Sequence, residues 1–128
     1  MYHAIGLLQS NSDFSLAEAA VRLRQALPEH AVVPAGQRIR IERGEWWIAL
    51  ELVVGPQLRG ETEGIVGKVA GLEPAEAEAF VSSEKRVEVW TDVSDPFMEH
   101  FNDYLSVVEV LKSFRGLLAV DPKEPGVL

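Results

Sequence analysis

The stretch at positions 37–54, QRIRIERGEWWIALELVV, constrains the fold of this chain more than any other. Apolar and polar residues alternate along it, and an Arg-Gly pair interrupts the alternation near its middle. Side chains of a strand point alternately to opposite faces, so the pattern predicts two antiparallel strands joined by a tight turn at Arg43-Gly44. The chain is therefore expected to contain a β-sheet whose faces this hairpin defines.

The predicted hairpin has one apolar face and one mixed face, because its alternation is kept through both strands. With the turn at Arg43-Gly44, Ile41 pairs with Trp46 on the apolar face. The mixed face carries Arg38, Arg40, Trp47, Ala49, Glu51 and Val53. In this register Arg40 lies opposite Trp47, where a guanidinium can stack on an indole.

Helix and strand signals on both sides of the hairpin predict a mixed fold. Residues 2–9 are apolar at both odd and even positions, as in a strand covered on both faces. Residues 15–27 have helical spacing and begin with a Ser15/Glu18 capping box. The remaining expected segments are a turn-rich connection at 55–64, helical turns at 65–72, a helix at 73–84, a strand at 85–92, a helix at 95–114, a strand at 116–121 and a loop-like tail at 122–128.

The expected order of elements is β-α-β-β-α-β-α-β. Its first six members match a ferredoxin-like plait, an α+β fold with helices on one face of a mainly antiparallel sheet, here extended by a C-terminal helix and strand. A competing arrangement makes 85–92, 95–114 and 116–121 a right-handed parallel unit. With 128 residues, we expect 1–128 to form one domain.

Charge and composition narrow the classes of function. The net charge is −8, and residues 1–60 are neutral overall, so residues 61–128 carry the whole imbalance. Such a chain repels phosphate backbones, which argues against nucleic-acid binding. The apolar segment WWIALELVVG is too short to span a membrane, and MYHAIGLLQSNSD reads as a first strand and not as a signal peptide, so a cytoplasmic protein is expected. The absence of Cys removes thiolate chemistry.

The mixed sheet face is the first candidate site. Trp90, in the strand at 85–92, has the same facing as Trp47, and a plait leaves this face without helices. The expected partner-binding residues are Trp47, Trp90, Arg38, Arg40 and Arg86. The partner is a second copy, another protein or a small ligand, because exposed apolar patches of this kind mark interaction sites. The alternative is that the helix at 95–114 folds over this face and makes it internal.

The second candidate site lies in WTDVSDPFMEHFNDY, positions 90–104. In the parallel arrangement Asp92 and Asp121 meet at the carboxyl ends of adjacent strands, with Asp95 nearby, and their oxygens suit Mg²⁺ or Ca²⁺. Each aspartate also has a structural explanation. Asp95 before a proline resembles a helix N-cap, and Asp92 follows a strand as turn residues do.

No pattern in the chain announces catalysis. There is no nucleophile elbow, phosphate-binding loop or dinucleotide fingerprint in the sequence. We therefore expect a small acidic binding module that needs no cofactor and acts through its sheet face. The alternatives are a divalent-metal-dependent hydrolase built on the aspartates and a toxin-neutralising, immunity-type protein, which the acidic C-terminal half would suit.

Overall fold

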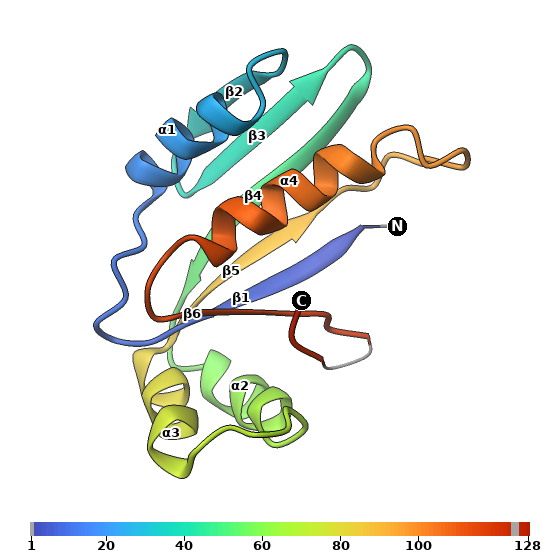
Figure 1. The fold of residues 1–128 in the computed structure, drawn as a ribbon. Helices are drawn as coiled ribbons and strands as arrows, with labels where there is room; N and C mark the ends of the chain where they lie inside the picture. The colour runs from blue at the N-terminus through green and yellow to red at the C-terminus, as the bar shows by residue number, and fades with distance from the viewer. Residues whose placement is uncertain (1, 124–125) are drawn as a thin grey trace.

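A six-stranded antiparallel sheet organises the protein in the computed structural model, which describes residues 2–123 and 126–128 (Figure 1). The strands lie in the order β2-β3-β4-β5-β1-β6. They are β1 (His3–Leu8), β2 (Ala31–Ala35), β3 (Arg38–Arg43), β4 (Trp46–Val54), β5 (Lys85–Trp90) and β6 (Leu117–Val120). The helices are α1 (Leu16–Ala26), α2 (Leu58–Val66), α3 (Pro74–Ser83) and α4 (Phe101–Lys112). The expected α+β class is confirmed.

The helices cover the two faces of the sheet unequally. In Figure 1, α1 and α4 lie in front of the sheet, and the main apolar core forms between them and β3, β4 and β5. Its largest fully buried side chains include Leu23, Ile39, Ile41, Ile48, Leu50 and Leu111. On the other face, α2 and α3 form a second core with Leu7, Phe80 and Val120 over β1 and β6. Neither core contains a side chain that β2, β3 or β4 presents on this second face.

The strand order expected for a ferredoxin-like plait is not confirmed. A plait places its first strand between its third and fourth strands, whereas here β5 pairs with both β4 and β1. The reason lies in the connection from β4 to β5. It holds two helices that pack on each other, so the chain returns to the end of the sheet that it left and β5 runs antiparallel beside β4.

The competing parallel unit is present only in part. Both β5 and β6 pair antiparallel with β1, so they run parallel to each other, and α4 connects them. However, β1 lies between them, and the two strands are not neighbours. The prediction of adjacent parallel strands is therefore wrong.

The β3–β4 hairpin has the predicted faces but a different register. The two turn residues are Gly44 and Glu45, since Arg43 pairs with Trp46 and Ile41 with Ile48. Gly44 has φ +61°, which suits the first turn position of a type II′ hairpin. The register moves by two residues, so every side chain keeps its face because the side-chain period of a strand is also two.

Two elements were not expected from the sequence. The edge strand β2 contains Pro34, which weakens the strand pattern. Helix α2 occupies much of the segment 55–64 that reads as a turn-rich connection. It forms despite its glycines because Leu58, Thr62 and Val66 recur every four residues and bury one side.

The predicted helix at 95–114 is shorter than expected. It begins at Phe101 and ends at Lys112, and residues 91–100 form a loop. Met98 has φ +55°, a left-handed conformation that no helix accommodates, so the helix cannot extend back to Asp95. Phe97, which the periodicity places on the apolar stripe, is 84% exposed.

Other predicted features are confirmed. Ser15 caps α1, and its side chain accepts the N–H of Glu18 at 3.1 Å. Pro74 stands in the first turn of α3. In the tail, Val127 forms a bridge with Val120, and positions 124–125 lie outside the described residues.

Candidate functional site

Four predicted side chains lie together on the second face of the sheet. Arg38 and Arg40 come from β3, Trp47 from β4 and Trp90 from β5, and we call this surface the indole–arginine face. At its centre Ala49 pairs with Arg40 on one side and with Trp90 on the other. Ala49 is only 1% exposed although no helix core includes it, so the larger side chains around it cover it.

The two indoles of this face contact each other and the arginines. The rings of Trp47 and Trp90 meet edge to face, with centroids 5.2 Å apart and an interplanar angle of 85°. The Arg40 guanidinium carbon lies 4.6 Å from the Trp47 ring centroid, and that of Arg38 lies 5.3 Å from the Trp90 ring centroid. Such contacts are favourable because the face of an aromatic ring carries negative charge.

Both arginines remain about half exposed and paired with acids. Arg38 contacts Glu51 at 2.9 Å, and Arg40 lies 3.6 Å from Glu42. Exposed pairs of this kind contribute about 0–1 kcal/mol, so they orient the guanidinium groups more than they stabilise the fold. The arginines therefore present charge and indole together at the surface.

A hydrogen bond behind the rings fixes the ends of β4 and β5. Thr91 is buried, and its hydroxyl donates to the Trp47 carbonyl at 2.5 Å. The same oxygen accepts the N–H of Val93. The backbone that carries both indoles is thus tied across the two strands.

Arg86, the fifth predicted residue, lies apart from the other four. It shares their sheet face, but it is only 8% exposed and forms ion pairs with Glu61 of α2 and with Glu88. The sequence pattern placed its side chain on the correct face. The pattern did not predict that the Arg86 side chain is buried, because it did not predict helix α2.

The position of α4 also shows whether the helix predicted at 95–114 lies over Trp47 and Trp90. The buried residues of α4 belong to the main core, together with Ile39, Ile48 and Leu50 of the opposite face. The alternative that the helix at 95–114 covers Trp47 and Trp90 is therefore wrong.

The three candidate metal ligands are placed differently from expectation. Asp92 and Asp121 follow strands that β1 separates. Both oxygens of Asp95 accept hydrogen bonds, from the hydroxyl of Tyr2 at 2.6 Å and from the N–H groups of Glu99 and His100 at 2.9 and 2.8 Å. Within residues 2–123 and 126–128, no group of three or more His, Cys, Asp or Glu residues could hold a metal ion.

The pKa values of Asp95 and of Tyr2, which donates a hydrogen bond to it, are shifted from their usual values. Burial raises the pKa of Tyr2 to about 12, and the hydrogen bond and negative charge of Asp95 add to this effect. Burial also acts to raise the pKa of Asp95, but the hydrogen bonds from Tyr2, His100 and Glu99 outweigh it and lower that pKa below 3.8. Asp95 is thus a charged structural cap for this loop.

A histidine cluster was not expected from the sequence. Asp103 Oδ2 lies 2.9 Å from His100 Nδ1 and 3.3 Å from His30 Nε2, although His30 reads as a loop residue without a partner. The His100 ring stacks on Trp46, with centroids 4.4 Å apart. The i, i+3 spacing of His100 and Asp103 could indicate one of these contacts. No sequence signal links them to His30, because the contact depends on how α1 and α4 pack.

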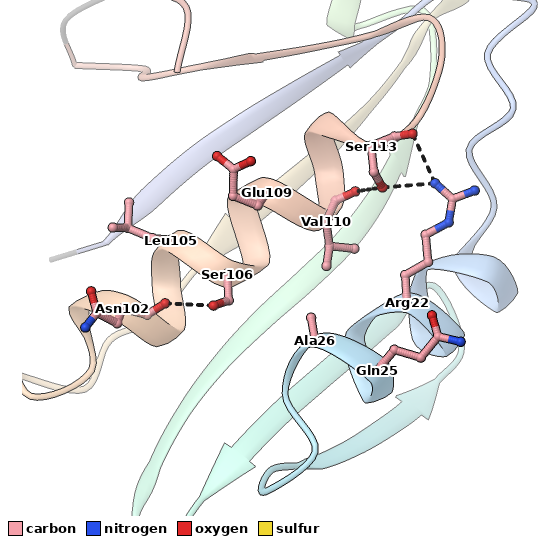
Figure 2. A pocket seen from close by; sticks show the side chains of 9 residues that line it. All are labelled: Arg22, Gln25, Ala26, Asn102, Leu105, Ser106, Glu109, Val110 and Ser113. Atoms are coloured by element: carbon pink, nitrogen blue, oxygen red, sulfur yellow. Dashed lines mark hydrogen bonds between the residues drawn. The ribbon is translucent and has the colours of Figure 1, made fainter.

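A groove between α1 and α4 is a further surface feature (Figure 2). It has a volume of about 690 Å³, and its lining includes Arg22, Ala26, Leu105, Ser106, Glu109 and Val110. At one end Arg22 donates to the hydroxyl and carbonyl oxygens of Ser113, which joins the two helices. The helices α1 and α4 that line this groove pack on the face of the sheet opposite the indole–arginine face.

No protein-family model matches the chain, and neither a curated protein nor a solved structure matches it. In the part of the chain that the structure describes, every helix is too short or too polar to cross a membrane. A functional inference therefore depends on the geometry of the surfaces described above.

Proposed function

We propose that the protein acts by binding, and that the indole–arginine face is the surface that binds. The observation that carries this proposal is the Trp47–Trp90 pair on a sheet face outside both apolar cores. Tryptophan and arginine are enriched at protein interfaces and dominate their binding energy, whereas most of a protein surface contributes little.

The face is well ordered before any partner arrives. The Thr91 hydroxyl fixes the backbone at Trp47, and each guanidinium is held between an acid and a ring. Ordering a long side chain on binding costs about 0.5–1.5 kcal/mol, and groups already in place avoid most of that cost. This arrangement favours tight contact with a partner of complementary shape.

The chemistry of the face favours a protein surface as its partner. The side chains come from three neighbouring strands, so the surface is broad. The two half-buried indoles leave area for further apolar contact, and the two half-exposed guanidinium groups can bind a further carboxylate or aromatic group. A folded protein offers both over such an area.

The test is a comparison of three variants in affinity capture from a cell extract. Any partner identified, including the chain itself, is then purified and titrated against each variant. We expect Trp47→Ala and Trp90→Ala to weaken its binding by at least about tenfold, as the loss of a central interface residue does. Leu105→Ala is the matched control, since Leu105 is 40% exposed on the opposite side of the sheet.

Two outcomes would contradict the proposal. In the first, Leu105→Ala weakens the binding as much as the tryptophan variants do. In the second, neither tryptophan variant changes it.

A further inference from the structure

Both edges of the sheet are poor sites for adding another strand. At the β2 edge, Pro34 has no N–H to donate, and the Val32 carbonyl already accepts a hydrogen bond from Arg24. At the β6 edge, Val127 bridges Val120, and the Leu128 N–H donates to Ala119 at 2.9 Å. A second sheet is therefore more easily accommodated on the indole–arginine face than at either edge.

The indole–arginine face differs in charge from the chain as a whole. The protein carries a net charge of −8. On this face the charges are paired within the chain: Arg38 with Glu51, Arg40 with Glu42, and Glu88 with Arg86, which is buried. Two copies of the chain repel each other overall, but here they can meet at a surface whose charges are paired.

The register of the strands makes the face self-complementary. Arg38, Glu51 and Glu88 form one row across β3, β4 and β5, and Arg40, Ala49 and Trp90 form the next. A two-fold axis that runs along β4 in the plane of contact places β3 of one copy over β5 of the other. Arg38 of each copy then faces an acid of the other, and Arg40 faces an indole.

We propose that the indole–arginine face binds a second copy of this chain, sheet on sheet, about a two-fold axis parallel to β4. This inference rests on the proposed binding function and names its partner. In aligned packing two sheets lie about 10 Å apart, a gap that side chains of both copies fill. Trp47 meets its own counterpart near the axis, toward the end of the sheet that lies away from the second core of α2 and α3.

The proposal predicts which charge reversals can compensate each other. Arg38→Glu alone places two acids across the contact, and Glu88→Lys alone places two cations there. Each variant alone is therefore expected to dimerise at least about tenfold more weakly than the wild type, because like charges then face each other across the contact. An equimolar mixture of the two variants restores an opposite pair at both contacts, so it is expected to form a heterodimer.

Sedimentation velocity over a range of concentrations measures these states. Lys112→Glu and Glu109→Lys are the matched controls, because both residues lie on α4 on the opposite side of the sheet and pair with each other. Both controls are expected to dimerise as the wild type does. Circular dichroism measures whether each variant is folded. Recovery of the dimer when the two variants are mixed would show independently that both are folded.

The outcomes separate this inference from the proposed function. A wild type that stays monomeric at all concentrations overturns the second copy as partner, while the capture experiment with Trp47→Ala still decides whether the face binds another protein. A dimer that survives Arg38→Glu unchanged overturns the inference, since its interface lies elsewhere. Single variants that are monomeric, with a mixture that is also monomeric, overturn the two-fold arrangement.

Discussion

Trp46 and Trp47 are adjacent on β4 and offer a direct comparison of the two sheet faces. Trp46 is 4% exposed, belongs to the main core and stacks on His100. Trp47 points to the other face, where it contacts Trp90 and Arg40. Replacing each by alanine removes the same side chain from the same strand, so the difference in cost reports the environment alone.

The structure sets the expected magnitudes. Loss of a buried tryptophan leaves a cavity, and Trp46→Ala is expected to lower the free energy of unfolding by about 3–5 kcal/mol. Trp47→Ala loses an edge-to-face pair, about 0.5–1.5 kcal/mol, and an exposed cation–π contact, about 0.5–1 kcal/mol. We therefore expect Trp47→Ala to lower the free energy of unfolding by about 1–2.5 kcal/mol in addition to the loss of its partial burial, and by less in total than Trp46→Ala does.

Urea unfolding followed by circular dichroism measures both costs. The protein must be dilute, because association would add to the apparent stability of the folded state. Equal costs for the two variants, each above about 3 kcal/mol, would show that Trp47 lies in a core as Trp46 does.

Further predictions follow from single groups. Since the pKa of Tyr2 is raised from 10.0 to about 12 on folding, the stability that it contributes is complete below pH 10 and is lost as the pH rises toward 12. Asp95→Asn is expected to bring that pKa back toward 10.0, as measured by tyrosinate absorbance. Gly116→Ala is expected to lower the melting temperature, because Gly116 has φ +69° and an added Cβ lies 3.0 Å from Ser12 Cα; an unchanged melting temperature would contradict this. Ser15→Ala is expected to lower the free energy of unfolding by about 1 kcal/mol through loss of the α1 cap, and an unchanged urea midpoint would contradict it.

Local patterns in the sequence predicted the faces of the central strands. Alternation in β3 and β4 placed Arg38, Arg40 and Trp47 on one face, and that assignment survived a shifted turn because register errors of two residues preserve it. The pairing of Trp47 with Trp90 needs a further fact, that β5 lies beside β4. The sequence supports several strand orders, so this neighbour relation could not be predicted.

The missed features depend on interactions between distant segments. Helix α2 is weak by composition, and its burial against β1 and β6 outweighs the cost of its glycines. The start of α4 depends on Asp95, which binds two backbone N–H groups of the loop and the Tyr2 hydroxyl instead of capping a helix. The contact of His30 with Asp103 depends on the packing of α1 beside α4.

Hydroxyl-radical footprinting shows whether association buries the indole–arginine face, because it reports the exposure of each of the three tryptophans separately. In dilute protein, Trp47 and Trp90 are expected to oxidise clearly faster than Trp46. In concentrated protein their rates are expected to fall toward that of Trp46, as the second copy covers the indole–arginine face. Rates for Trp47 and Trp90 that are independent of concentration would show that no second copy covers this face, and rates as slow as that of Trp46 in dilute protein would show that the face is not exposed.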